Sequence, residues 1–185
     1  MSERILIAGG TGLLGRALAR HLATSGREIV LLSRTAAGDG RLLDLPSGCR
    51  VATWDGRTAN GWGELASGAA AIVNLAGESI AGGRWSAARK ARILSSRQQA
   101  TAAVVAAIAQ AQTPPRMLLQ ASAVGYYGDR ADELLAEDAG AGGGFLGETT
   151  SAWEAASAPA ERRGVRRVLA RTGVVLARDG GAFPK

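Results

Sequence analysis

Short apolar runs alternate with longer amphipathic stretches along most of the chain. An apolar run of about five residues between turn-forming residues is typical of a buried strand. Such runs predict strands at residues 4–8, 28–32, 50–54, 71–75, 116–121 and 166–171. Because strands that alternate with helices form a parallel sheet with helices on both faces, we expect an α/β protein with a doubly wound parallel sheet.

Helical spacing of apolar residues predicts the helices between these strands. The first, residues 13–23, has an apolar face formed by Leu14, Leu18 and Leu22. The longest begins near Ser86, a good N-cap residue, and ends near residue 110. Its expected buried positions include Ile93, Leu94, Val104, Val105 and Ile108.

A later helix is predicted at residues 148–162. It follows a run at residues 139–144 in which four of six residues are glycine. Glycine-rich segments favour flexible connections. This run is therefore either a mobile lid or a plain disordered connection.

The segment Ile5–Gly15 joins the first strand directly to the first helix through a glycine-spaced turn. Gly9, Gly12 and Gly15 follow the GxxGxxG variant of the dinucleotide-binding fingerprint. In this fingerprint the first glycine permits a tight turn, the second lets the pyrophosphate approach the backbone, and the third lets the helix pack on the strand. The amino end of the helix then directs unpaired N–H groups at the phosphates.

We therefore expect a Rossmann-type fold with a dinucleotide site at this turn. The residues expected to form it are Gly9, Gly10, Thr11, Gly12, Leu13, Leu14 and Gly15. A glycine turn that holds no ligand is the alternative interpretation.

The end of the second strand bears on the choice of cofactor. An acidic residue there favours NAD, whereas an arginine accommodates the 2′-phosphate of NADP. Here the strand runs into Ser33 and Arg34, and no carboxylate follows until Asp39. The pattern predicts NADP, with the Ser33 hydroxyl and the Arg34 guanidinium at the 2′-phosphate. A solvated surface arginine is the alternative for Arg34.

Two further loops are candidates for contact with the cofactor. Asp55, just past the third strand, is placed to accept a hydrogen bond from the adenine amino group, although a loop aspartate equally often caps a turn. After the fourth strand, Leu75, Ala76 and Gly77 would let the backbone pass beside the ribose and pyrophosphate.

Composition and charge narrow the function classes. The 185 residues suit one domain, and no apolar run approaches the roughly 20 residues that span a bilayer, so we expect no membrane association and a cytoplasmic location. Cys49 and His21 are the only residues of their types, so no metal site or Ser-His-Asp triad is expected.

The net charge is +6, but the basic residues are mostly dispersed and lack interleaved aromatic residues. We therefore expect no nucleic-acid partner, and a basic nucleic-acid-binding module is the third interpretation.

Several motifs together resemble those of an extended short-chain dehydrogenase/reductase. More narrowly, they resemble the atypical branch called epimerase family proteins, which is related to nucleotide-sugar epimerases. The motifs are the segments 9–15, 33–34, 74–78, 122–128 and 171–176, with the pairs Arg84-Trp85, Ser96-Arg97, Phe145-Leu146 and Trp153-Glu154. The resemblance implies NADP binding, a contact from Arg97 to the cofactor, and an approach of the backbone at Val174 and Val175 to the nicotinamide. Ala121, at the end of the fifth strand, is also expected at the cofactor.

The same resemblance implies a catalytic serine, a tyrosine and a lysine four residues after it. Ser122 fills the serine position, but Leu146 and Thr150 stand where the tyrosine and the lysine are expected. Neither side chain titrates near neutral pH. Tyr127 is the candidate substitute acid, although it equally fits a packing role under the site.

We expect residues 1–185 to form an NADP-binding Rossmann domain that acts on an unknown small-molecule substrate, as an oxidoreductase or a sugar-nucleotide epimerase. In complete members of the family a carboxyl-terminal substrate region follows, and this chain, which reads to Lys185, is either shortened there or has a minimal substrate side. The alternative function is a non-catalytic nucleotide-binding sensor or regulator.

Overall fold

The computed structural model describes residues 3–34, 45–178 and 180–182. Its main strands are β1 (Arg4–Ala8), β2 (Glu28–Ser33), β3 (Cys49–Thr53), β4 (Ala71–Asn74), β5 (Met117–Ala123) and β6 (Arg166–Thr172). The α-helices are α1 (Leu13–Ala23), α2 (Ala87–Gln110) and α3 (Gly144–Ser157). Shorter elements are the 3₁₀ helices η2 (Gly63–Ala66), η3 (Val124–Tyr127) and η4 (Ala158–Arg163), and the strands β7 (Leu176–Ala177) and β8 (Gly180–Gly181).

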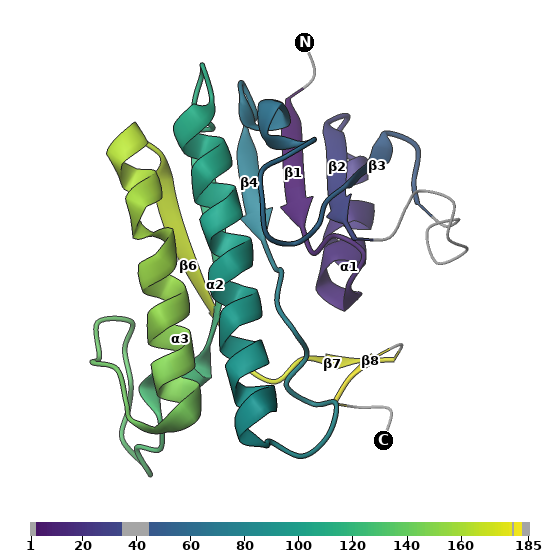
Figure 1. Ribbon diagram of the computed structural model, residues 1–185. Coiled ribbons are helices and arrows are strands. Elements are labelled where there is room, and N and C mark those ends of the chain that lie inside the picture. Colours follow the sequence, from purple (N-terminus) through teal and green to yellow (C-terminus); the bar gives the residue numbers. More distant parts are fainter. Residues whose placement is uncertain (1–2, 35–44, 179, 183–185) are drawn as a thin grey trace.

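The six main strands form one parallel sheet in the order β3-β2-β1-β4-β5-β6. Helices α2 and α3 cover one face of this sheet and α1 packs against the other (Figure 1). The doubly wound α/β fold expected from the sequence is confirmed. The strand order reverses between β1 and β4, and the carboxyl ends of strands at such a switch point flank the crevice where open α/β sheets bind ligands.

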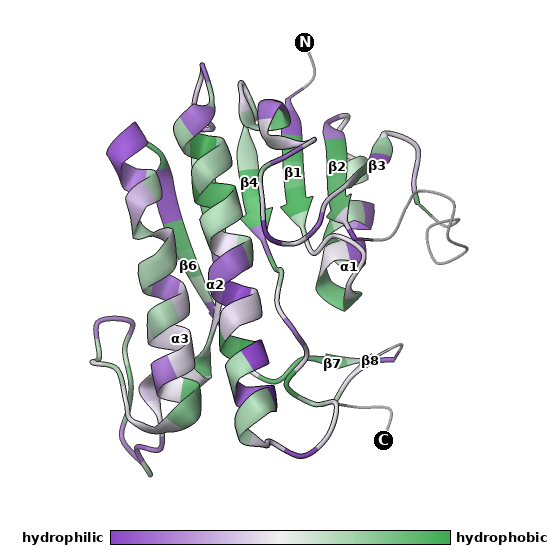
Figure 2. Cartoon of the chain, in the orientation of Figure 1, coloured by the Kyte–Doolittle hydropathy of each residue, from purple (hydrophilic) through white to green (hydrophobic). Residues whose placement is uncertain are grey.

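The core consists of two hydrophobic clusters, one on each face of the sheet. On one face Val104 and Ile108 of α2 belong to the same buried cluster as Leu6 and Ile72 of the strands. The cluster on the other face lies under α1. Because both faces are covered, the central strands are continuously apolar rather than alternating, and they are the greenest part of Figure 2. Of the three leucines predicted on the apolar face of α1, Leu18 and Leu22 pack against the cluster, but Leu14 is 41% exposed.

Most predicted elements lie within two residues of the observed ones. Strand β1 and helix α1 have the predicted bounds, and Ser86 caps α2 by accepting a hydrogen bond from the Arg89 amide (3.3 Å). The prediction for α3 was wrong at both ends, because the helix begins at Gly144 rather than at residue 148 and ends at Ser157, where the 3₁₀ helix η4 follows. Propensity alone disfavours glycine in a first turn, but here the Phe145 ring packs edge-on against Trp85 of the loop that precedes α2.

The glycine-rich run before α3 packs against the protein at its carboxyl end. The Gly142 amide donates to the Tyr126 carbonyl (2.8 Å), and a Cβ on Gly142 would overlap the Tyr127 carbonyl. The end of the run is therefore a close backbone contact with η3, which neither a lid nor a disordered connection predicts.

The segment after β6 returns toward the glycine turn. Strands β7 and β8 pair antiparallel, and a Cβ on Gly180 would lie 3.2 Å from the Leu13 side chain. None of the helices in the described ranges is long and apolar enough to cross a membrane.

Candidate functional site

The turn between β1 and α1 contains glycines in different steric environments. Gly9 has a φ of +74°, and a Cβ there would lie 3.0 Å from the Ala76 amide nitrogen. Gly12 is exposed at the N-cap of α1, and its amide donates to the Gly9 carbonyl (3.0 Å). A Cβ on Gly15 would lie 2.6 Å from atoms of Gly10, so α1 can approach the turn only with glycine there. The environments of Gly9 and Gly15 fit a tight turn and close helix packing, and at Gly12 a Cβ would meet only the Gly9 carbonyl.

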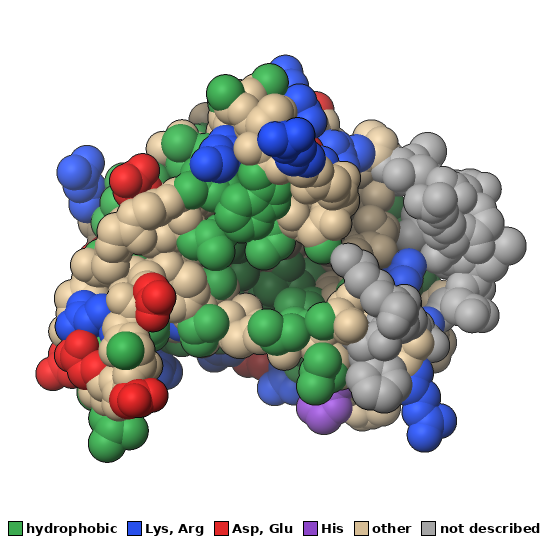
Figure 3. All heavy atoms as spheres, turned by 90° about the horizontal axis from the view of Figure 1, so that it is seen from below, with side chains coloured by type: hydrophobic (Ala, Val, Ile, Leu, Met, Phe, Trp, Pro, Cys, Tyr) green, Lys and Arg blue, Asp and Glu red, His purple; other side chains and the backbone are tan. Residues whose placement is uncertain are grey.

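A cleft of about 610 Å³ opens beside this turn, within the size range of small-ligand sites. Seen from the carboxyl edge of the sheet, the surface is hollowed and hydrophobic side chains surround the hollow (Figure 3). The cleft is lined by Gly9, Thr11, Gly12, Leu32, Ser33, Arg34, Trp54, Asp55, Gly56, Arg57, Leu75, Ala76, Gly77, Glu78, Ser79, Arg92, Ser95, Ser96, Gln99 and Ala100.

Many residues predicted at the cofactor are brought together here. The cleft residues among them are Gly9, Thr11, Gly12, Ser33, Arg34, Asp55, Leu75, Ala76 and Gly77. The predicted residues outside the lining are Gly10, Leu13, Leu14, Gly15, Arg97, Ala121, Val174 and Val175. Gly10 packs toward Leu31 of β2, and Val174 is 77% exposed after β6.

Ser33 and Arg34 lie at the carboxyl end of β2, as predicted. The Ser33 hydroxyl is buried and lies 3.4 Å from the Thr11 hydroxyl of the glycine turn. The Arg34 side chain passes over Gly56, where a Cβ would lie 3.4 Å from the Arg34 Cδ. Asp39 lies outside the described residues, and no described carboxylate forms an ion pair with Arg34.

Asp55 caps a turn, which is one of the two roles considered for it. Its Oδ1 accepts from the amides of Arg57 (2.7 Å) and Thr58 (2.8 Å), and its Oδ2 accepts from the Thr58 hydroxyl (2.8 Å). The amide hydrogen bonds of Thr58 and Arg57 hold the pKa of the Asp55 carboxyl below its ordinary value. The carboxylate therefore fixes the loop that carries Gly56 and Arg57 along the wall of the cleft.

One wall of the cleft comes from α2 and was not predicted from the sequence. It consists of Arg92, Ser95, Ser96, Gln99 and Ala100. These positions are spaced three and four residues apart, so they share one face of a helix. This spacing could have identified them, because a helix face that packs against a sheet usually carries apolar side chains, whereas this face carries small and polar ones.

Arg97 lies behind this wall. Its guanidinium donates to the carbonyls of Glu78 (2.9 Å) and Ile93 (3.0 Å) and lies 4.9 Å from the centre of the Trp153 ring. A Cβ on Gly77 would lie 3.1 Å from the Arg97 side chain. In this structure Arg97 supports the backbone after β4, and it does not line the cleft.

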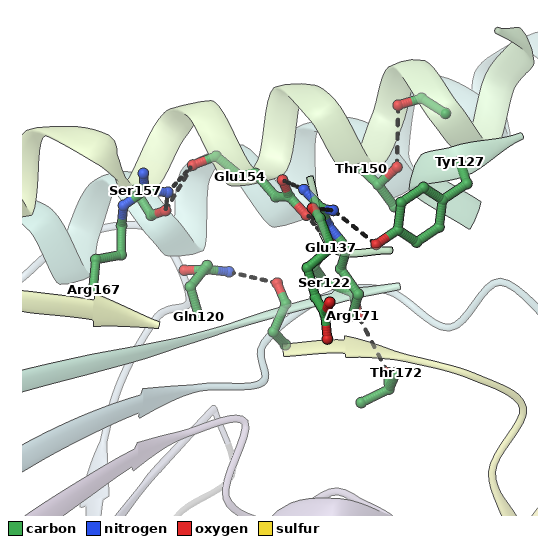
Figure 4. Close-up of polar contacts among 12 residues, drawn as sticks. Gln120, Ser122, Tyr127, Glu137, Thr150, Glu154, Ser157, Arg167, Arg171 and Thr172 are labelled. Carbon is green, nitrogen blue, oxygen red and sulfur yellow. Dashed lines mark hydrogen bonds and ion pairs between the residues drawn. The ribbon is translucent and has the colours of Figure 1, made fainter. Parts of the chain in front are cut away.

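Ser122 and Tyr127 belong to one polar network between the sheet and α3 (Figure 4). The Ser122 hydroxyl donates to Glu154 Oε1 (2.5 Å). Arg171 donates to both oxygens of Glu154, and its Nη1 donates to the Tyr127 hydroxyl (2.9 Å). The Arg171 guanidinium also lies 3.6 Å from the centre of the Tyr126 ring. The ion pair therefore links the two candidate catalytic hydroxyls.

The centre of this network is ionised. Burial would raise the pKa of the Glu154 carboxyl, but the hydrogen bonds from Arg171 and Ser122 outweigh it and hold the pKa below its ordinary value. The same pairing raises the pKa of Arg171. Because Glu154 is ionised, it must accept the hydrogen bond, and the Ser122 proton is directed at Glu154.

The positions of the missing tyrosine and lysine lie in the first turns of α3. The Thr150 hydroxyl donates back to the helix carbonyls of Leu146 (2.7 Å) and Gly147 (3.1 Å). Leu146 is half-exposed, and a Cβ on Gly125 would lie 3.2 Å from its Cβ. Neither side chain is a proton donor or acceptor of the kind that titrates near neutral pH.

Residues 5–156 match the NAD dependent epimerase/dehydratase family. Over 177 residues the chain is 37% identical to an epimerase family protein of Mycobacterium tuberculosis, covering 96% of this chain and 55% of that protein. Over 184 residues it is 37% identical to the epimerase family protein SDR39U1 of Bos taurus, covering 97% and 57%. The chain thus spans little more than half the length of these curated relatives.

Solved structures show the same similarity. A crystal structure of human epimerase family protein SDR39U1 (isoform 2) with NADPH superposes with a TM-score of 0.75 and 31% identity, over 97% of this chain and 57% of that one. A nucleoside-diphosphate sugar epimerase from Corynebacterium glutamicum superposes with a TM-score of 0.78 and 34% identity, over 100% of this chain and 36% of that one. The family resemblance seen in the motifs is confirmed, and the chain belongs to the NAD dependent epimerase/dehydratase family.

Proposed function

We propose that residues 1–185 form an NADP(H)-binding domain. The observation that carries this proposal is the cleft at the switch point, which is lined by both the exposed Gly12 and Arg34. No described carboxylate forms an ion pair with Arg34. A similar human protein was crystallised with NADPH. The residues present fit the group, because Gly12 leaves room beside a helix amino terminus and Arg34 presents a guanidinium fork.

Each part of the cleft has a role in this proposal. The amino end of α1 and Gly12 hold the pyrophosphate, and Leu75 to Gly77 pass beside the ribose. Ser33 and Arg34 bind the 2′-phosphate. When bound, the nicotinamide supplies or accepts a hydride.

The reaction class proposed for the whole protein is that of an oxidoreductase or a sugar-nucleotide epimerase acting on a small carbonyl or alcohol substrate. We also propose that the relatives recognise substrate partly with the portion of their chains that this sequence does not match. The Tyr127 hydroxyl is the candidate proton donor, because it accepts from Arg171 and keeps its own proton available.

A second function, a cofactor-binding sensor or regulator without turnover, is favoured by a specific observation. The Ser122 hydroxyl is directed at Glu154, and Leu146 and Thr150 cannot act as acid or base. NADPH consumption in the presence of substrate distinguishes the two functions.

The binding proposal is tested by reversing the charge at Arg34. The Arg34→Glu variant should lose roughly 1.5 to 3 kcal/mol of NADPH affinity in calorimetry, the range for a lost charged hydrogen bond, while NADH affinity stays unchanged. Arg166→Glu is the matched control, because Arg166 is exposed at the start of β6, on the opposite edge of the sheet. Equal losses for both cofactors would contradict the assignment of Arg34 to the 2′-phosphate.

A further inference from the structure

Hydrogen bonds hold the loop after β3, residues 54–58, in place although much of it is exposed. Besides the three hydrogen bonds accepted by the Asp55 carboxylate, the Thr58 carbonyl accepts from the indole nitrogens of Trp54 (2.8 Å) and Trp62 (2.9 Å). Both indoles are buried in the core under α2. The backbone of Arg57, which lies between Asp55 and Thr58, is therefore held from both sides.

This loop lies directly beside the end of β2. Strands β2 and β3 pair in parallel with Ser33 opposite Thr53, and the Trp54 amide donates to the Ser33 carbonyl (2.8 Å). Gly56, at a φ of +80°, leaves the space that the Arg34 side chain occupies. The pairing of the two strands thus brings Arg57 to the same wall of the cleft as Arg34.

The charges on this wall are unbalanced. No carboxylate in the described ranges forms an ion pair with the guanidinium of Arg34 or Arg57. The carboxylate nearest to Arg57 in sequence, Asp55, accepts three hydrogen bonds within its own turn. Arg92, on the opposite wall, differs because it faces Glu78 at 3.5 Å. Two guanidinium groups that no carboxylate in the described ranges pairs, both lining the same cleft, favour an anionic ligand group there.

We propose that Arg57 is a second specificity-determining residue, which shares the 2′-phosphate of NADP(H) with Arg34. The proposal rests on the proposed cofactor function and adds a residue that the sequence analysis did not identify. A phosphate monoester presents three acceptor oxygens and close to two charges, so one arginine leaves part of it unpaired. Gly56, next to Arg57 in the sequence, leaves room for the Arg34 side chain, and both arginines line the cleft.

The test compares cofactors that differ only in the 2′-phosphate. Affinities of NADPH, NADH, 2′,5′-ADP and 5′-AMP are measured by calorimetry for the unmodified chain and for Arg57→Ala and Arg57→Lys. We expect Arg57→Ala to weaken NADPH and 2′,5′-ADP about tenfold and NADH and 5′-AMP less than about twofold. Arg57→Lys should restore part of the loss, because it keeps the charge but not the fork.

Arg50→Ala is the matched control, since Arg50 lies in β3, the strand that precedes the Arg57 loop, and pairs with Glu28 (2.9 Å) outside the cleft. It removes the same charge and should leave the ratio of NADPH to NADH affinity unchanged. Arg57 contributes its backbone amide to the turn, so both variants should fold, and thermal unfolding of each variant checks this.

Each other outcome overturns the proposal in a recognisable way. Equal weakening of all four ligands would mean that Arg57 contacts the adenine ring rather than the phosphate. Unchanged NADPH affinity in Arg57→Ala would leave the phosphate to Arg34 alone. An unmodified chain that binds none of the four ligands would overturn the proposed cofactor function itself.

Discussion

Arg171 and Glu154 form a two-point ion pair, with Nε 2.8 Å from Oε1 and Nη2 3.0 Å from Oε2. The side chains are only 16% and 8% exposed. Arg171 comes from β6 and Glu154 from α3, so the pair ties the edge strand of the sheet to the helix that carries the candidate catalytic positions. Removing one partner of a buried pair leaves an uncompensated charge, which costs more than the pair itself contributes.

Replacing Glu154 by glutamine should destabilise the fold by about 3 kcal/mol at pH 7, because Arg171 stays charged without its partner. Chemical denaturation measures this loss. Glu133→Gln is the control, because Glu133 pairs with Arg130 at the surface and its loss should cost less than about 1 kcal/mol.

The same carboxylate predicts a pH dependence. The pKa of Glu154 is lower in the folded chain than in the unfolded chain, so its contribution to stability is complete above the unfolded pKa and is lost as the pH falls through the folded pKa. Stability should therefore fall as the solution is acidified below about pH 4.5, the region of an ordinary glutamate. Glu154→Gln should flatten this slope in part, because Glu3, Glu28, Asp55 and Glu133 also have lowered pKa values. Identical slopes for both proteins would contradict the assignment.

Substitutions at two glycines of the turn should affect cofactor binding and folding separately. Gly12 has an ordinary φ of −74°, and a Cβ there would meet only the Gly9 carbonyl, at 3.3 Å. Gly12→Val should therefore fold but lose measurable NADPH affinity, because its side chain stands where the pyrophosphate approaches. Gly15→Ala should instead lose about 2 kcal/mol of stability or more, since its Cβ would overlap Gly10. Unchanged NADPH affinity in a folded Gly12→Val protein would refute the fingerprint interpretation.

Ala131 has a φ of +46°, the only positive φ outside glycine in the described part of the chain. A left-handed conformation costs an L-residue with a Cβ roughly 1 to 2 kcal/mol, and part of this is offset by the greater unfolded-state entropy of glycine. Ala131→Gly should therefore raise stability by about 0.5 to 1 kcal/mol. Ala136→Gly, in the same loop without a positive φ, should lower it. The same sign for both variants would show that this strain is absent.

The parts of the fold with strong periodicity were predictable from the sequence. The central strands are buried on both faces, so their apolar runs, such as Ile29–Leu32, are unambiguous. The start of α3 was not predictable, because it depends on the contact of Phe145 with Trp85, more than fifty residues away in sequence. Local propensity carries no information on such a contact.

The candidate site divides in the same way. Gly9, Gly12 and Arg34 lie in local motifs, and the sequence analysis found them. Arg57 depends on the pairing of β2 with β3, which only the fold supplies. The ion pair between Arg171 and Glu154 likewise could not be predicted from the sequence, because the two residues meet only where α3 packs against β6.

The last prediction concerns catalysis. Because Leu146 and Thr150 replace the usual proton-transfer groups, this chain should bind NADPH but turn over nucleotide sugars and small carbonyl compounds barely or not at all. Loss of positioned acid and base groups typically removes ~10² to 10⁴ of rate. Optical measurement of NADPH oxidation against a panel of both substrate classes tests this expectation.

Tyr127→Phe and Ser122→Ala are the decisive variants for any turnover that is found. Arg171 donates to the Tyr127 hydroxyl, which leaves the phenol proton free for a substrate, whereas the Ser122 proton is held by Glu154. Turnover that depends on Tyr127 but hardly on Ser122 would make Tyr127 the relocated proton donor and refute the inactive interpretation. Matched NADPH affinities in both variants would show that the effect lies in proton transfer and not in cofactor binding.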